Sequence, residues 1–430
     1  MDGTSPAEKL ELCAKLFRLC AVVTDDNGQG DAERREYITF VGEAVEALAT
    51  GVRLNRPADE ILSGGDISGN ARIGMWRTTA ESALSAVVGA ASAAAEGQIS
   101  EQLGADIGEA VIASRLPEGS KSVLLLGLSL SARASAPVFS YTYMRLAFSI
   151  DDALQTKIGL KRPEYVFDGG EEALLERCPV CGGADSVPVY NAFSYMMNHF
   201  GAPFSPAKLW VQCRDCGNMH TYGFPGRHLR SGPGGGELIA PREGAYAPAS
   251  KQPVSLPVWG KILSSLAEYT SGRELLEVGI GAGELIATAL EFGFDVSAVE
   301  ISEEQARYAA DMLGIPIWRG DMLDFDTERR FDIITMGDVI EHVSDPRAAL
   351  VKAHGFLRDG GVLWLSTPNF ESGFTRMMKF GDAMWCEPSH ISWFSFDTLR
   401  ALLSETGFEV REYSVSGRYN GSMELTAQKR

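Results

Sequence analysis

The C-terminal part of the chain alternates short apolar strands with helices of about ten residues, and this alternation restricts the fold more than any other feature of the sequence. Parallel strands need a crossover connection, usually a helix, so the pattern predicts a parallel sheet with helices on both faces. The last two strands follow each other without a helix, which predicts an antiparallel finish. The expected strands are Glu274–Val278, Asp295–Ile301, Ile315–Arg319, Phe331–Met336, Val362–Ser366, Phe408–Ser416 and Met423–Gln428, and the expected helices are Glu284–Phe292, Glu303–Leu313, Arg347–Leu357 and Phe396–Thr406.

A glycine-rich loop joins the first of these strands to the first helix, and its sequence from Glu277 to Glu284 is E-V-G-I-G-A-G-E. Glycines at this position allow a tight turn and a close approach of the backbone to a ligand at the carboxyl end of the strand. A dinucleotide site requires G-x-G-x-x-G, but Glu284 occupies the third glycine position, and its carboxylate would repel a pyrophosphate. The loop therefore favours a ligand with an ammonium group and a sulfonium rather than phosphates.

With four further motifs in order, this segment resembles the class I S-adenosylmethionine-dependent methyltransferases over residues 259–430. The further motifs are Val299-Glu300, Gly320-Asp321-Met322, the segment Gly337–Val343 with sequence G-D-V-I-E-H-V, and Asp359-Gly360-Gly361. The resemblance implies an α/β fold, a Rossmann-like seven-stranded methyltransferase domain. It also implies S-adenosyl-L-methionine as the cofactor.

The resemblance further implies which residues bind this cofactor. The glycine loop would hold the methionine moiety, Glu300 the ribose hydroxyls and Asp321 the adenine amino group. Met322 would pack on the adenine ring, with ordinary core packing as the alternative for this side chain. The complete set is Glu277, Gly279, Gly281, Gly283, Glu300, Asp321, Met322, Gly337 and Asp338.

Transfer to a hydroxyl or an amine also requires a group that accepts a proton. In resembling enzymes, a segment similar to H-I-S-W-F-S at His390–Ser395 follows the fifth strand and caps the pocket, which makes His390 the first candidate for this base. A structural role in that cap is the alternative, and Glu387 is the weaker second candidate. In the resembling ubiquinone-pathway O-methyltransferases, residues matching Asp338, Glu341 and His342 hold a divalent cation, but a metal-free structural role is favoured here.

Four of the seven cysteines form two C-x-x-C-G motifs, with Cys178 and Cys181 in the first and Cys213 and Cys216 in the second. Each motif places two thiolates on one tight turn, and two such turns complete a closed tetrahedral zinc site. The site is expected to be structural, because four protein ligands leave no position for water. A redox-active dithiol pair is the main alternative, and the stretch Phe193–Ala207 between the motifs is expected to be an extra loop.

The N-terminal part of the chain is expected to be mainly helical and contains no residues with an evident chemical role. Apolar residues recur at helical spacing in Ala7–Val22 and Arg34–Val52, and Thr78–Ala95 is rich in small residues. The stretch Val123–Leu126 fits a strand or a helix equally well. Three domains are predicted: a helical domain at 1–165, a zinc-binding segment with a linker at 166–236, and the methyltransferase domain at 237–430. The N-terminal helices could form a homodimer interface, a lid or a module that docks a partner, and their residues do not select among these roles.

Composition limits the partners and the compartment. The formal net charge is −18, which counts against nucleic acid and anionic membranes. The start of the chain lacks a signal-peptide pattern, and the paired cysteines fit metal binding in a reducing cytoplasm.

The sequence therefore predicts an enzyme that methylates a small-molecule or peptide acceptor, with O-methylation favoured over N-methylation. An RNA-modifying methyltransferase, using Arg214, Arg227, His228 and Arg230, and a non-catalytic cofactor-binding or scaffold protein are the alternatives.

Overall fold

The computed structural model describes residues 256–430 without a gap, together with 172–197, 200–226, 236–242 and parts of 101–167. The helices predicted at 7–22, 34–52 and 78–95 lie outside the described residues, as does most of the glycine-rich run that ends at Gly236. The predicted domain boundaries therefore remain predictions.

The chain divides into two compact units. The first comprises Met1–Glu172, Pro188–Trp210 and Trp385–Pro388, and the second comprises Ala173–Val187, Val211–Met384 and Ser389–Arg430. In the described part of the first unit, α6 and α7 form a pair of helices. Val123–Leu126 lies inside α6, so this stretch is helical. The bounds are Glu118–Ser131 for α6 and Pro137–Ile150 for α7.

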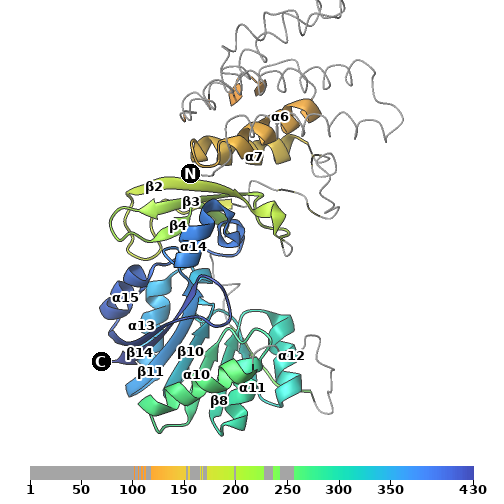
Figure 1. The fold of residues 1–430 in the computed structure, drawn as a ribbon. Helices are drawn as coiled ribbons and strands as arrows, with labels where there is room; N and C mark the ends of the chain where they lie inside the picture. The colour runs from red at the N-terminus through yellow and green to blue at the C-terminus, as the bar shows by residue number, and fades with distance from the viewer. Residues whose placement is uncertain are drawn as a thin grey trace, which may run out of the picture. The chain divides into compact units, whose positions relative to one another are not determined.

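The second unit is built on an eight-stranded sheet with strand order β13-β14-β11-β10-β7-β8-β9-β6 (Figure 1). The strands from β11 to β9 are parallel, whereas β13 and β14 close one edge in antiparallel orientation, as the sequence predicted. The expected seven strands are present, but the sheet is eight-stranded because β6 adds to β9 at the other edge. The bounds are β6 Glu237–Ile239, β7 Glu274–Val278, β8 Asp295–Glu300, β9 Ile317–Arg319, β10 Phe331–Gly337, β11 Leu357–Pro368, β13 Phe408–Val415 and β14 Ser422–Lys429.

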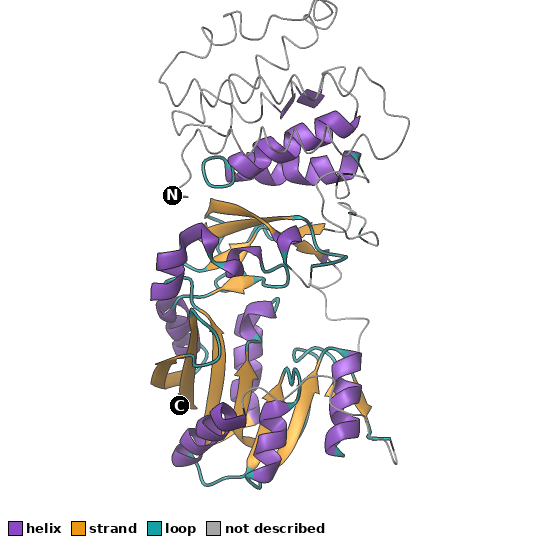
Figure 2. Ribbon diagram, turned by 45° about the vertical axis from the view of Figure 1, so that its right-hand side comes forward, coloured by secondary structure: helices purple, strands orange, loops and turns teal. Residues whose placement is uncertain are grey.

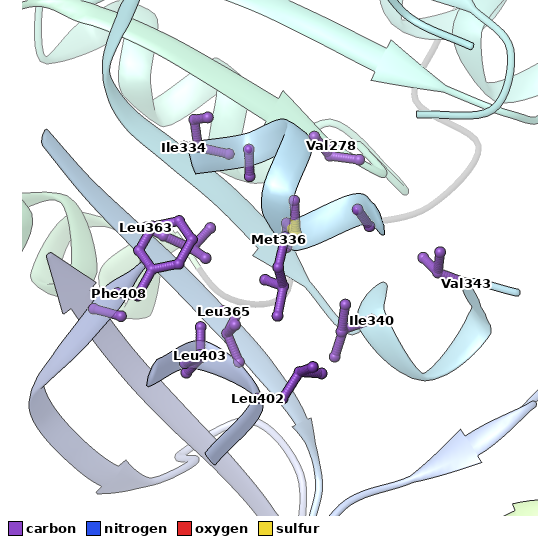
Figure 3. Close-up of a cluster of buried hydrophobic side chains, with 14 of the residues drawn as sticks. Val278, Ile334, Met336, Ile340, Val343, Leu363, Leu365, Leu402, Leu403 and Phe408 are labelled. Carbon is purple, nitrogen blue, oxygen red and sulfur yellow. The ribbon is translucent and has the colours of Figure 1, made fainter. Parts of the chain in front are cut away.

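Helices cover both faces of this sheet (Figure 2). Adjacent residues of a strand point to opposite faces. Accordingly, Leu275 packs in one cluster with residues of α10 and α11, and Leu276 packs in another with residues of α13 and α15. Figure 3 shows the second cluster, in which Leu402 and Leu403 of α15 lie beside β10 and β11. The helices are α10 Leu256–Tyr269, α11 Glu284–Glu291, α12 Glu303–Leu313, α13 Pro346–Phe356 and α15 Phe396–Glu405.

The helix boundaries follow from local side-chain chemistry. Ser302, Asp345 and Ser395 each accept a backbone N–H at the start of α12, α13 and α15, which satisfies donors that have no partner within the helix. Gly314 ends α12 in the left-handed conformation, with φ 69°.

A smaller sheet of order β12-β4-β3-β2 contains the segments around the cysteine motifs. In its register, Ser392 lies opposite His220 and Trp393 lies opposite Met219, so the segment after His390 is held by β4. The predicted loop is partly confirmed, because the described residues between η3 and β3 are irregular. The remaining elements are β1 Glu172–Leu174, β2 Ser186–Phe193, η3 Ser194–Met196, β3 Ala207–Cys213, β4 Met219–Thr221, β5 Gly223–Pro225, η4 Ile340–His342, α14 Gly373–Met378, η5 Lys379–Gly381, η6 Ala383–Cys386 and β12 Ser392–Trp393. Within the described residues, no helix has both the length and the apolar character needed to cross a membrane.

Candidate active site

The glycine loop lies where the sequence predicted it, between β7 and α11. Gly279, Gly281 and Gly283 have φ values of 73°, 52° and 80°, a region that side chains disfavour. A Cβ at Gly279 would lie 2.5 Å from Cγ2 of Val339, whereas a Cβ at Gly281 would meet nothing within 4 Å. Packing therefore requires glycine at 279, while Gly281 faces open space that a ligand can fill.

Two buried carboxylates stand beside this loop. Glu277 lies in β7 and Glu300 ends β8, and each side chain is about 5% exposed. Burial raises the pKa of both, and the charge of Glu300 raises the pKa of Glu277 further. Oε1 of Glu300 accepts the N–H of Ser302 at 2.8 Å, whereas Oε2 of Glu277 has no hydrogen-bond partner among the described residues. A ligand that brings hydrogen-bond donors would satisfy these groups.

The third strand of the predicted site, β9, leads into Asp321 and Met322. Oδ1 of Asp321 accepts the N–H of Leu323 at 2.8 Å, which fixes the orientation of the carboxylate. Met322 is 4% exposed and packs in the same core cluster as Phe325. Core packing therefore already accounts for the Met322 side chain, and its contact with adenine remains a prediction.

Gly337 ends β10, and Asp338 follows it in the left-handed region with φ 56°. The Asp338 N–H donates to the carbonyl of Ser366 at 3.0 Å, and the Ser366 hydroxyl donates to Oδ1 of Asp338 at 2.8 Å. Arg418, in the loop between β13 and β14, places Nη2 3.2 Å from Oδ2 of Asp338. Sequence reasoning missed Arg418, because an arginine in a loop between two strands gives no signal of its own.

His390 lies beside Glu341 and His342, which follow the same strand end as Asp338. Potential ligand atoms of the three side chains all lie within 4.8 Å of one another. The rings of His342 and His390 meet nearly at right angles, with centroids 4.6 Å apart. Backbone contacts hold the segment, because Ile391 N–H donates to the carbonyl of Glu341 at 2.8 Å.

Glu341 is the buried member of this histidine–carboxylate cluster. Its side chain is 1% exposed, and burial together with the charge of Asp338 raises its pKa well above the usual range. Neither carboxyl oxygen has a hydrogen-bond partner among the described residues. Asp338 is turned to Arg418 and does not belong to the cluster. A metal ion here would therefore be held by Glu341, His342 and His390 rather than by the trio of Asp338, Glu341 and His342.

Glu387, the second predicted base, belongs to the first unit, whereas His390 belongs to the second. The segment 385–388 contacts β3: Trp210 Nε1 donates to the carbonyl of Trp385 at 2.8 Å, and Lys208 Nζ donates to the carbonyl of Pro388 at 3.3 Å. Lys208 is buried, and burial lowers its pKa to about 7, although the nearby charge of Glu387 opposes this change. The role of Glu387 in catalysis stays a prediction.

The residues of the second unit fit S-adenosylmethionine. Glu277, Glu300, Asp321 and Asp338 supply carboxylate acceptors at the carboxyl ends of four neighbouring strands, where open α/β sheets bind their ligands. Such a set suits a ligand with hydroxyl and amino donors and a positive sulfonium. The open space at Gly281 leaves room for the ligand. Oε2 of Glu277, which has no hydrogen-bond partner among the described residues, can accept a hydrogen bond from it.

The four predicted metal-binding cysteines converge in the second unit. All are free thiols, and their sulfur atoms lie within 4.8 Å of one another, with two Sγ–Sγ pairs at 3.6 Å. A tetrahedral zinc ion with Zn–S bonds of about 2.3 Å places its sulfurs about 3.8 Å apart. The two turns match: Gly182 and Gly217 have φ values of 75° and 77°, and each donates its N–H to the first cysteine of its motif.

The environment of Cys181 and Cys216, the second cysteine of each motif, does not favour a redox role for these two thiols. A reactive dithiol requires a thiolate with a low pKa. Here burial and the neighbouring sulfurs raise the pKa of Cys181 to about 11, and the hydrogen bond with Cys178 raises that of Cys216. His220 lies outside the cluster, with Nδ1 3.0 Å from the carbonyl of Thr221.

Comparison with known proteins finds similarity to methyltransferases. The family model described as a methyltransferase domain matches residues 256–413. A ubiquinone biosynthesis O-methyltransferase from Caulobacter vibrioides is 28% identical over 170 residues, which cover 35% of this chain and 68% of the relative. A protein of the same name from a Caulobacter species (strain K31) is 30% identical over 146 residues, covering 31% and 58%. For several other relatives of this name, the match spans less than two thirds of their length.

Among solved structures, an S-adenosylmethionine-dependent methyltransferase from Clostridium acetobutylicum is 11% identical with a TM-score of 0.33, covering 41% of this chain and 92% of that one. Residues 256–413 of the chain are therefore similar to a methyltransferase domain.

Proposed function

We propose that this protein uses S-adenosyl-L-methionine to methylate a hydroxyl group of a small molecule, and that His390 is the general base. The observation that carries this proposal is the position of His390 beside Glu341, which like Asp338 follows β10, the neighbour of the strand β7 that leads into the glycine loop. The relatives named as O-methyltransferases support oxygen as the methylated atom. N-methylation and a peptide acceptor are the alternatives within the same class.

In this reaction the chain binds the cofactor, aligns the reactants away from water and accepts a proton. When bound, the cofactor supplies a methyl group that is already electrophilic, so the protein mainly aligns the reactants and excludes water. Glu300 and Asp321 would hold the ribose hydroxyls and the adenine, and the glycine loop would hold the methionine end. His390 would take the proton of the acceptor hydroxyl, and its segment is fixed for this role by the bond from Ile391 to Glu341.

We further propose that Cys178, Cys181, Cys213 and Cys216 hold one structural zinc ion. Cys178 and Cys213 belong to the same buried cluster as Leu399 and Leu402 of α15. The metal would therefore stabilise the packing against α15, which covers one face of the sheet, and would not take part in the reaction.

Calorimetric titration of the full chain with S-adenosylmethionine and S-adenosylhomocysteine tests the cofactor assignment. We expect micromolar binding, and we expect Glu300→Ala to weaken it at least tenfold because the variant removes the acceptor for the ribose. Glu304→Ala is the matched control, since Glu304 is an exposed carboxylate four residues away, on α12. Equal loss in both variants, or no binding to the wild type, would contradict the assignment.

Methyl transfer from labelled cofactor to a panel of phenols, aliphatic alcohols, amines and short peptides tests the acceptor class. Turnover with a hydroxyl compound that is lost in His390→Ala would support O-methylation. Turnover with amines alone would replace it by N-methylation. Cofactor binding without turnover on any acceptor would favour the scaffold alternative.

A further inference from the structure

The Arg418 side chain is buried and surrounded by aromatic rings at the edge of the sheet where the site lies. It is 7% exposed, although it comes from the loop between β13 and β14. Its guanidinium carbon lies 4.6 Å from the ring centroid of Trp259, 5.5 Å from that of Trp364 and 5.3 Å from that of Tyr419. Burying a guanidinium costs free energy unless the group is paired, so the partners of Arg418 indicate its role.

Its partners are two carboxylates and a hydroxyl. Nη2 lies 3.2 Å from Oδ2 of Asp338 and also donates to the hydroxyl of Ser366, while Nε lies 3.7 Å from Oε1 of Glu424. Glu424 is fixed in turn by the hydroxyl of Ser416 at 2.7 Å. Arg418, Asp338 and Glu424 together carry two negative charges and one positive charge. This excess of negative charge favours the binding of a further cation beside them.

Asp338 has an uncommon backbone conformation that this group supports. Among the described residues, only Asp338 and Lys379 have a positive φ without being glycine. Such residues cost free energy and persist where the surrounding contacts determine them, often at functional sites. Here the contacts are the two hydrogen bonds to Ser366 and the ion pair with Arg418.

The group lies next to the glycine loop. Val339, which follows Asp338, would contact a Cβ at Gly279. Trp259, which covers Arg418, donates its indole N–H to Glu284 at the start of α11 at 3.0 Å. The residue after Asp338 thus lies against the start of the loop that is assigned to the methionine moiety, and the ring that covers Arg418 is hydrogen-bonded to the residue after that loop.

We propose that Arg418 is a positioning residue that fixes the Asp338 carboxylate so that it binds the ammonium group of the methionine moiety of the cofactor. This inference rests on the proposed function. The faces of the guanidinium are occupied by aromatic rings and its Nη2 by Asp338 and Ser366, so Arg418 acts through Asp338 rather than by contacting the ligand.

The test compares three ligands by calorimetry on the full chain: S-adenosylhomocysteine, its decarboxylated derivative, which keeps the ammonium, and 5′-methylthioadenosine, which lacks both groups. The variants are Arg418→Met, Arg418→Lys, Asp338→Asn and the double variant Asp338→Asn/Arg418→Met. Methionine retains apolar bulk between the rings. Arg411→Gln is the control, because Arg411 is a partly exposed arginine of β13 paired with Glu409.

We expect Arg418→Met and Asp338→Asn each to weaken the binding of S-adenosylhomocysteine and of its decarboxylated derivative to the same extent, by at least tenfold. The double variant should lose no more affinity than Asp338→Asn alone, and Arg418→Lys should retain part of the affinity. Binding of methylthioadenosine should change less than twofold, which also shows that the variants are folded.

Three results would overturn the inference. If Arg418→Met weakens only the ligand that carries a carboxylate, Arg418 contacts the cofactor directly. If it weakens methylthioadenosine equally, its role is structural. Wild-type affinity in Arg418→Met would also refute it. Failure of the wild type to bind any of the three ligands would refute the proposed function itself, and this result is distinguishable because it does not depend on a variant.

Discussion

The imidazole rings of His342 and His390 meet edge to face with their centroids 4.6 Å apart, although 47 residues separate them in the chain. The contact depends on two backbone acceptors. Nδ1 of His342 lies 3.1 Å from the carbonyl of Ser389, and the carbonyl of Glu341 accepts the N–H of Ile391. The segment that carries His390 is therefore anchored to the residues that follow β10, which places a proton acceptor beside the strand end where Asp338 lies.

If His390 is the general base, His390→Ala should lower kcat for methyl transfer by about 10²–10⁴-fold, the usual contribution of general base catalysis. The affinity for S-adenosylhomocysteine should stay within threefold of the wild type, because the cofactor contacts are unchanged. Single-turnover rates and calorimetry measure the two effects separately. His354→Gln is the control, since this histidine lies on α13 against Phe408. A parallel loss of cofactor affinity in His390→Ala would instead indicate a structural role for His390.

The methyltransferase sheet was predictable because its strands and helices each satisfy a local pattern. Glu274–Val278 and Glu303–Leu313 have the predicted bounds, and the strand and helix ends elsewhere differ from the prediction by at most a few residues, apart from β11, which begins earlier. Short apolar runs, helical spacing and N-terminal caps are properties of neighbouring residues, so they can be read from the sequence. β6 has only three residues and pairs with a strand about 80 positions away, which no local pattern reveals.

Residues of the candidate site could be predicted where they belong to a sequence motif. They could not be predicted where only tertiary contacts bring them to the site. The glycine loop and the cysteines were found from spacing, and Glu300 was assigned from the family resemblance. Arg418 and Trp259 were not, because their meeting depends on how the last loop of the sheet folds over α10. Asp338 was assigned correctly to the strand end, but its pairing with Arg418 instead of the histidine cluster depends on its positive φ.

Gly281 and Gly314 both have positive φ values, so they allow a matched test of whether a ligand lies against the glycine loop. Gly281→Ala should cost about 1 kcal/mol of stability, the cost of a Cβ in the left-handed region, and should weaken cofactor binding at least tenfold because the methyl group enters the open space. Gly314→Ala has the same backbone cost, with φ 69° and nothing within 4 Å, but lies at the end of α12. It should therefore leave binding unchanged. Urea unfolding and calorimetry on both variants measure the two quantities, and equal binding losses would exclude a ligand above Gly281.

Gly279→Ala should behave differently from Gly281→Ala. Its Cβ would lie 2.5 Å from Val339, so the loop or the segment after Asp338 must move. We expect a larger loss of stability than in Gly281→Ala, about 2–4 kcal/mol, since overpacking adds to the backbone cost. A Gly279→Ala protein as stable as Gly281→Ala, measured by urea unfolding, would contradict the contact with Val339.

The cysteine cluster should hold one zinc ion per chain. Elemental analysis of protein purified without chelator should give a zinc-to-protein ratio near one, and Cys178→Ser or Cys213→Ser should lose the metal and unfold at lower urea concentration. Cys386→Ser is the control, because Cys386 lies outside the cluster in the described part of the chain. Retention of zinc in Cys213→Ser, or loss in Cys386→Ser, would contradict the assignment.

Lys208 should make the stability of the protein depend on pH in the alkaline range. Burial lowers the pKa of Lys208 to about 7 in the folded protein, whereas in the unfolded chain the amine keeps its proton up to its ordinary pKa of 10.5. Between these values the unfolded state binds more protons, so stability rises with pH, by at most about 1.4 kcal/mol per pH unit. The cost of burying the charged amine is therefore largest below pH 7 and is relieved as pH rises.

The measurement is the free energy of unfolding in urea at pH 6.5, 8 and 9.5 for the wild type and for Lys208→Met, with a reductant present. The variant lacks the titrating amine, so its stability relative to the wild type should fall as pH rises across this range. Lys261→Met, an exposed lysine of α10, should differ from the wild type by the same amount at each pH. A difference between Lys208→Met and the wild type that does not change with pH would mean that Lys208 keeps its proton in the folded protein. The carboxylates Glu387 and Glu172, whose charges oppose the effect of burial, would then hold the amine charged.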